Sequence, residues 1–190
     1  MTESEIMHLL EQTGAYLEGH FLLTSGRHSD RYFEKFRVLE HPQHAERLCK
    51  ELARRFQDVS VDVVIGPAVG GIILAYETAR HLGARAIFAE REAGRMRLRR
   101  GFAIEPGEKV LVVEDVVTTG GSVREVVDLV EHTDSQIQGV GILMDRSGGT
   151  IDLGYRLEAL VTLDIQSYDP RDCPLCQQGI PITQRGSRNI

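Results

Sequence analysis

The chain has 190 residues, of which 42% are hydrophobic and 26% charged, and its formal net charge at pH 7 is −6. This length suits one domain with a full core, and the composition is that of an ordinary globular protein. The negative charge argues against a nucleic-acid partner, and no apolar run approaches the roughly 18 residues that a membrane span requires. Three cysteines and an acidic N-terminus unlike a signal peptide favour the reducing cytoplasm.

The first forty residues predict a helix followed by short strands. Residues 2–5 have the form of a capping box, and apolar residues follow at helical spacing, so we expect a helix to about Tyr16. Two short β-prone segments, 21–23 and 31–36, surround a turn that contains Gly26.

Helix and strand patterns alternate through the rest of the chain. Helices are expected over 42–56, 72–82 and about 121–130, and strands over 63–65, 86–89, 110–113, 140–144 and 160–163. This alternation indicates an α/β fold, with a mostly parallel central sheet flanked by helices. Ligands of such sheets bind beyond the carboxyl ends of the strands, where two glycine-rich loops and an acidic pair fall.

Residues 110–122, VLVVEDVVTTGGS, carry the strongest chemical signal. A buried strand delivers Glu114 and Asp115 to the sheet edge, and a Thr/Gly/Ser turn over 118–122 then leads into a helix. Inward backbone N–H groups, hydroxyls and the positive end of the helix form a cradle for a phosphate monoester. The carboxylates are expected to accept hydrogen bonds from the hydroxyls of an adjacent sugar. The alternative is a tight turn with two solvated acids, which the strand and the amphipathic helix disfavour.

This motif resembles the signature of the type I phosphoribosyltransferases. Residues 21–33, FLLTSGRHSDRYF, are similar to a signature of the branch of that family that acts on orotate, and similarity continues at 66–68 and 145–146. The resemblance implies one domain over 1–190, with a core over about 41–165. The N-terminal 40 residues and the C-terminal segment would form a small hood.

The resemblance also implies an activity. A family member of this branch joins orotate to phosphoribosyl diphosphate, with Mg²⁺, to give orotidine 5′-monophosphate and pyrophosphate in pyrimidine (UMP) biosynthesis. The metal would be held by substrate oxygens, with no direct protein ligand, and the enzyme would be a homodimer.

The resemblance assigns residues to three roles. Residues for phosphoribosyl diphosphate are Glu114, Asp115, Val116, Val117, Thr118, Thr119, Gly120, Gly121, Ser122 and Arg91. Residues for orotate are Thr24, Tyr32, Phe33, Thr118 and Arg146, the last as a guanidinium fork for the orotate carboxylate. Catalytic residues are Arg91, Arg95 and Asp115.

Residues 90–102, EREAGRMRLRRGF, contain five arginines. A solvated basic loop is one interpretation. The other is a loop that closes over pyrophosphate, with Gly94 and Gly101 as hinges and no regular structure between them. In the resembling family the corresponding loop reaches the neighbouring subunit, so we expect residues 90–101 to be mobile until an anion binds. The family loop is usually Lys-rich, so the residue that assists the leaving group stays open.

Two questions stay open at this point. Cys173 and Cys176 have metal-ligand spacing, but one pair is half of a zinc site, and Cys49 is remote. We favour reduced structural thiols, and we interpret the seven histidines as scattered. The alternatives for function are a phosphoribosyltransferase for another base, such as a purine, or a regulator that senses phosphoribosyl diphosphate. Arg146 speaks against a neutral base.

Overall fold

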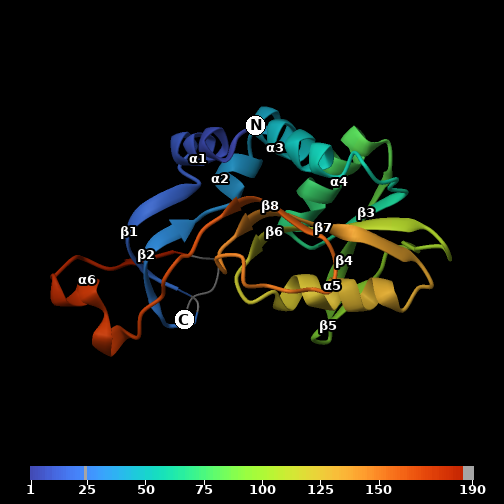
Figure 1. The fold of residues 1–190 in the computed structure, drawn as a ribbon. Coiled ribbons are helices and arrows are strands. Elements are labelled where there is room, and N and C mark those ends of the chain that lie inside the picture. Colours follow the sequence, from blue (N-terminus) through green and yellow to red (C-terminus); the bar gives the residue numbers. More distant parts are fainter. Residues whose placement is uncertain (24, 186–190) are drawn as a thin grey trace.

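A six-stranded sheet forms the centre of the computed structural model, which describes residues 1–23 and 25–185 (Figure 1). The strand order is β5-β4-β3-β6-β7-β8. The strands are β3 (Val63–Pro67), β4 (Arg85–Glu92), β5 (Arg95–Leu98), β6 (Lys109–Val117), β7 (Gln136–Asp145) and β8 (Leu157–Thr162). Neighbouring strands are parallel except β4 and β5, which pair antiparallel. The predicted mostly parallel α/β sheet is therefore confirmed.

Helices cover both faces of this sheet (Figure 1). Helices α3 (Pro42–Arg55) and α4 (Gly70–Leu82) pack on one face, and α5 (Gly121–Glu131) packs on the other. Each helix buries an apolar stripe at helical spacing, as Val123, Val126 and Val130 do on α5.

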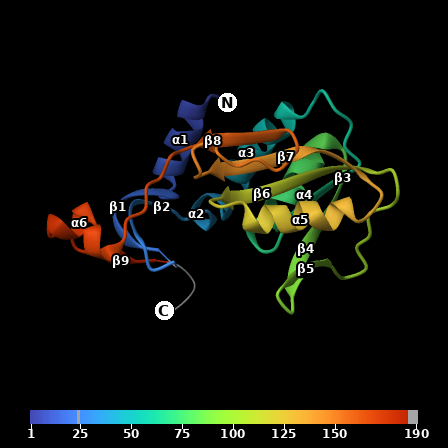
Figure 2. The same ribbon diagram turned by 60° about the horizontal axis from the view of Figure 1, so that its bottom comes forward.

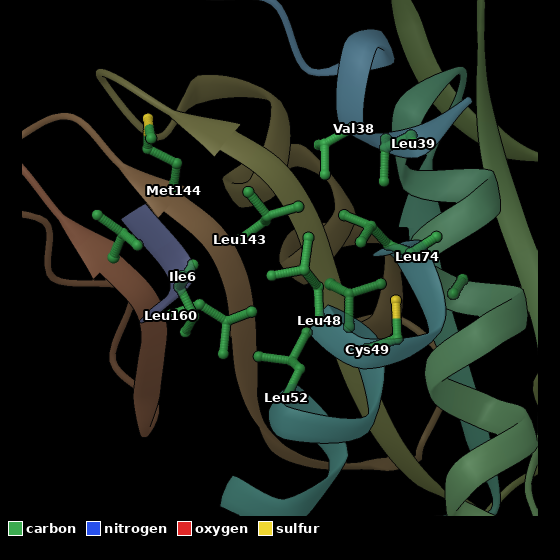
Figure 3. Close-up of a cluster of buried hydrophobic side chains, with 14 of the residues drawn as sticks. Ile6, Val38, Leu39, Leu48, Cys49, Leu52, Leu74, Leu143, Met144 and Leu160 are labelled. Carbon is green, nitrogen blue, oxygen red and sulfur yellow. The ribbon is translucent and has the colours of Figure 1, made fainter. Parts of the chain in front are cut away.

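The sheet thus separates two apolar clusters. Figure 3 shows the cluster beneath α1, α3 and α4, where Leu48, Leu52, Leu143 and Leu160 are nearly inaccessible to solvent. The cluster under α5 is built from branched residues such as Val112 and Ile142. Burial on both sides explains why β6 and β7 are continuous apolar runs.

A second, three-stranded sheet lies beside the main one (Figure 2). Its order is β2-β1-β9, from β1 (Tyr16–Leu22), β2 (His28–Phe33) and β9 (Thr183–Gln184). A short 3₁₀ turn (Pro170–Asp172) and α6 (Pro174–Gln177) precede β9. The hood expected from both ends of the chain corresponds to this sheet, although the exact domain boundaries stay a prediction.

The N-terminal elements differ in extent from the prediction. Helix α1 (Glu3–Gln12) has the expected capping box at Thr2, but it ends before Tyr16, because Gly14 takes a left-handed φ of 67° and β1 begins two residues later. The second strand occupies 28–33 rather than 31–36, and residues 36–39 instead form the short helix α2 (Phe36–Leu39).

The segment 90–101 was expected to lack regular structure, and this prediction was wrong. β4 and β5 form a hairpin in which Glu90 pairs with Arg97 and Glu92 with Arg95, around a turn at Ala93 and Gly94. Met96 and Leu98 alternate with the arginines and pack against the α5-side cluster. This period-2 pattern stabilises a strand despite the charge.

Among the described residues, no helix combines the length and apolarity needed to cross a bilayer.

Candidate active site

Strand β6 places two carboxylates in a nearly closed environment. Glu114 is 5% exposed and Asp115 3%. They lie inside the strand rather than after it, because β6 continues to Val117. Nζ of Lys35 lies 2.7 Å from Oδ2 of Asp115, so one of the two acids has a cation partner.

Burial governs the ionisation of both acids. Burial, together with the adjacent charge of Asp115, raises the pKa of Glu114 to about 8. Burial also raises the pKa of Asp115, against the opposing effect of Lys35. The site therefore holds one proton-binding acid and one acid matched with an ammonium group.

The turn after β6 encloses a hollow of about 300 Å³. Its lining is Glu114, Val116, Val117, Thr118, Thr119, Gly120, Gly121, Ser122, Val123 and Glu125. Gly120 takes a left-handed φ of 79° and α5 begins directly after it, so the residues whose N–H groups lack a partner within the helix line the hollow. The structure brings together the predicted phosphate residues 116–122 around one space.

A smaller hollow of about 150 Å³ adjoins the first and shares Glu114, Val116 and Ser122 with it. Lys35 and the loop after β3, residues 67–69, complete its lining. The chain at Gly70 passes so close that a Cβ there would lie 1.7 Å from Oδ2 of Asp115. A side chain at position 70 would therefore have to displace the Asp115 carboxylate.

Arg146 follows directly after β7, and its backbone N–H donates to the Val117 carbonyl (2.8 Å). Its Nε is buried and has no hydrogen-bond partner within residues 1–23 and 25–185. Burial lowers the pKa of this guanidinium, and Tyr32 and Tyr16 lie close enough to oppose that shift. A half-buried guanidinium with an unsatisfied Nε is suited to an anionic ligand.

The other residues predicted for the base differ in setting. Tyr32 is half-buried, whereas Phe33 is 7% exposed and packs in the core beneath α1 and α3. Thr24 lies outside the described residues.

The hairpin arginines are largely matched by glutamates. Arg91 binds Glu125 (Nη1–Oε2, 2.8 Å), which lines the phosphate hollow, so Arg91 stands next to that site. Arg100 binds Glu90 (2.9 Å), and Arg99 lies 3.3 Å from Glu92. The arginines therefore have anionic partners within the chain itself.

Sequence reasoning missed Lys35 as a partner of the acidic pair. It lies two residues beyond Phe33, at the end of the N-terminal signature, and no spacing rule connects it with Asp115. The available signal was a lysine directly after a segment whose other residues were assigned to the base site.

Comparison with known proteins agrees with this geometry. The family model described as "Phosphoribosyl transferase domain" matches residues 37–155. An orotate phosphoribosyltransferase of Pelotomaculum thermopropionicum is 60% identical over 190 residues, covering 100% of both chains. That of Thermotoga maritima is 53% identical, covering 97% of this chain and 99% of its own.

Solved structures show the same fold. The orotate phosphoribosyltransferase of Aeropyrum pernix superposes with a TM-score of 0.66 at 29% identity, covering 83% of this chain and 93% of its own. An adenine phosphoribosyltransferase of Rhodothermus marinus, at 20% identity and a TM-score of 0.68, covers 84% of this chain and 99% of its own and shares the fold alone. The family model and the full-length relatives together establish that this chain belongs to the orotate phosphoribosyltransferases, within the phosphoribosyltransferase family.

Proposed function

We propose that this chain transfers the phosphoribosyl group of phosphoribosyl diphosphate to orotate, in the biosynthesis of UMP. A ring nitrogen of orotate gives up its proton and bonds to C1 of the ribose, while the bond from C1 to the pyrophosphate oxygen breaks. The products are orotidine 5′-monophosphate and pyrophosphate. The observation that carries the proposal is the pair of adjoining hollows around Glu114, Asp115 and residues 116–122.

The phosphate hollow fits the 5-phosphate of the substrate. N–H groups at the start of α5 donate to the phosphate oxygens, and the helix dipole favours their negative charge. Glu114 and Asp115, at the rim shared with the smaller hollow, accept hydrogen bonds from the ribose hydroxyls. This fixes C1 for attack, and positioning of reactants is worth several kcal/mol.

Arg146 favours an anionic base, such as orotate, over a neutral one. Orotate carries a carboxylate, and the buried, unmatched Nε of Arg146 offers a charge-assisted donor for it. A neutral purine would leave that donor unsatisfied, which costs about 1–3 kcal/mol or more for a charged group. Tyr32, half-buried and close to Arg146, supplies a ring face for the base.

The site also fits Mg²⁺ held mainly by the substrate. Oxygen ligands suit this ion, and Glu114 and Asp115 provide carboxylates at the smaller hollow. Among the described residues, no group of three potential ligand side chains converges there. When bound with the diphosphate, the ion would neutralise charge that develops on the leaving group.

A homodimer is the assembly that the surface favours. Apolar side chains on and beside α4 are exposed: Val69 and Tyr76 at 67%, Phe36 at 41% and Ile73 at 36%. Val69, Ile73 and Tyr76 have the spacing of one helical face, and exposed apolar side chains grouped in this way favour an interface. Tyr76→Glu should shift the chain to monomers in light scattering. A Tyr76→Glu chain that remains dimeric would exclude this surface.

The hairpin is proposed to act on the neighbouring subunit of such a dimer. Asp115→Asn chains would be mixed with chains in which Arg91, Arg95 and Arg97 are alanine. If the loop works in trans, a mixed dimer contains one intact site and regains activity that neither parent has. Verified mixed dimers that stay inactive while both parents remain folded would place the hairpin in its own subunit.

The main test is consumption of orotate, followed by ultraviolet absorbance, with and without phosphoribosyl diphosphate. We expect turnover with both substrates and Mg²⁺, and none when adenine replaces orotate. Turnover of adenine, or none with either base, would refute the proposal. The three free cysteines agree with a place in the cytoplasm.

A further inference from the structure

Four potential metal ligands converge in the hood, away from the two hollows of the active site. They are His20 on β1, His28 at the start of β2, and the Cys173–Cys176 pair around α6. One ligand atom from each lies within 4.8 Å of all the others. The two histidines and Cys173 are buried, and Cys176 is exposed. The interpretation of the histidines as scattered was therefore wrong for these two.

The distances within this cluster match a tetrahedral shell. Nε2 of His20 lies 3.0 Å from Nδ1 of His28. Sγ of Cys176 lies 3.3 Å from Nδ1 of His28 and 3.8 Å from Nε2 of His20, and Sγ of Cys173 lies 3.6 Å from the same Nε2. Zinc bonds of about 2.05 Å to nitrogen and 2.3 Å to sulfur at tetrahedral angles separate N from N by about 3.3 Å and N from S by about 3.5 Å.

A hydrogen bond from Nδ1 of His20 fixes the tautomer in which Nε2 can bind a metal ion. Its Nδ1 lies 2.7 Å from the carbonyl oxygen of Ile180, so Nδ1 carries the proton and donates it. In the neutral ring Nε2 then presents a lone pair to the cluster. A second-shell carbonyl that fixes the tautomer in this way is the usual companion of a metal-bound histidine.

We propose that His20, His28, Cys173 and Cys176 form a structural zinc site that joins the C-terminal segment to the β1–β2 hairpin. Four protein ligands leave no open position, which is the mark of a structural rather than a catalytic site. Two imidazoles and two thiolates in a tetrahedral arrangement suit Zn²⁺ among the common metals. Metal binding can be measured without the proposed reaction, so the two proposals can fail separately.

The C-terminal segment has few other means of attachment. Residues 177–185 are exposed, and β9 consists of two residues that pair with β1. Upstream, His28 and Tyr168 exchange two backbone hydrogen bonds (2.9 and 2.7 Å), and Nε of Arg27 donates to Ser167 (2.8 Å). Little apolar surface is buried here, so a metal would supply much of the binding free energy of this segment.

The same anchor bears on the base site. His28 and Tyr32 belong to the same strand, β2, so a fixed hairpin also fixes the ring proposed to lie against orotate. We therefore expect loss of the metal to raise the orotate KM more than it changes the KM for phosphoribosyl diphosphate.

The test uses the full chain, produced with added zinc under reducing conditions and dialysed. Elemental analysis should find one zinc per chain. Cys176→Ser and His28→Ala should each lower this to less than about a tenth of an equivalent, since removing a ligand opens the shell. Cys49→Ala is the matched control: Cys49 lies in α3, where burial raises the pKa of its thiol to about 12, and this variant should keep its zinc.

Cobalt gives a second readout that does not depend on activity. Co²⁺-substituted protein should show the intense visible bands of a tetrahedral ion and thiolate-to-metal charge transfer, and both should disappear in Cys176→Ser while circular dichroism shows a folded chain. Absence of zinc from the reduced wild-type chain would overturn the proposal. So would retention of full zinc by folded Cys176→Ser, or a Cys173–Cys176 disulfide found by mass spectrometry in protein kept reduced.

Discussion

Two groups of charged residues in this molecule are organised in opposite ways. At the edge of the main sheet, Glu114 and Asp115 are withdrawn from water, and the half-buried Arg146 has an Nε without a partner among the described residues. In the β4–β5 hairpin, Arg99 and Arg100 are exposed and already matched with glutamates. Buried unmatched charges destabilise a fold, so they persist where a ligand completes them. Exposed matched pairs cost little and contribute little. The comparison distinguishes residues proposed to bind substrate from residues that form surface ion pairs.

The largest effect is expected from Arg146→Ala. Truncating one member of a buried charge pair costs about 2–5 kcal/mol, so the orotate KM should rise by about 30-fold or more while that for phosphoribosyl diphosphate changes little. Steady-state kinetics with each substrate varied will show the difference. Arg146→Lys is the control that keeps the charge but loses the planar fork. Equal losses for both substrates would mean that Arg146 does not distinguish the base.

The next effect concerns Asp115→Asn. Removing a charged acceptor for a ribose hydroxyl should weaken binding of phosphoribosyl diphosphate by about 1.5–3 kcal/mol, and Lys35 loses its partner at the same time. Calorimetry with phosphoribosyl diphosphate measures the change, and Lys35→Met reports the share due to the ion pair. An unchanged affinity would remove Asp115 from the ribose site.

Glu114 predicts an unusual pH dependence of stability. Burial raises its pKa from 4.5 to about 8, so between these values the folded chain holds a proton that the unfolded chain has released. Stability should therefore fall as the pH rises through this window. Glu114→Gln, which mimics the protonated acid, should flatten the dependence in thermal melts from pH 5 to about 8. Parallel curves for both proteins would contradict the assignment.

The smallest effect is expected in the hairpin. Arg99 and Glu92 are both about half-exposed, and such pairs contribute about 0–1 kcal/mol. Arg99→Ala should therefore shift the melting temperature by no more than about 2 °C. A larger destabilisation would show that the hairpin depends on its ion pairs, and the contrast with the sheet edge would then weaken.

Features built from contiguous residues could be predicted from the sequence, whereas contacts between segments far apart in the chain could not. The strand, acids, turn and helix over 110–131 are contiguous, so apolar periodicity and glycine chemistry described them well. In the hairpin, five arginines obscured the alternation of Met96 and Leu98, which was the strand signal. The cluster of His20 with Cys173 joins segments from opposite ends of the chain, and no local pattern reports such a contact.

The bare backbone at Gly70 has a consequence for protein engineering. Because a side chain there would force the Asp115 carboxylate to move, a saturation library at position 70 would measure how far that carboxylate can shift before activity is lost. Directed evolution toward other bases should place its diversity at Tyr32 and Arg146, away from this contact. Gly70→Ala involves no change of charge, so any loss of activity in this variant would report steric displacement of the carboxylate.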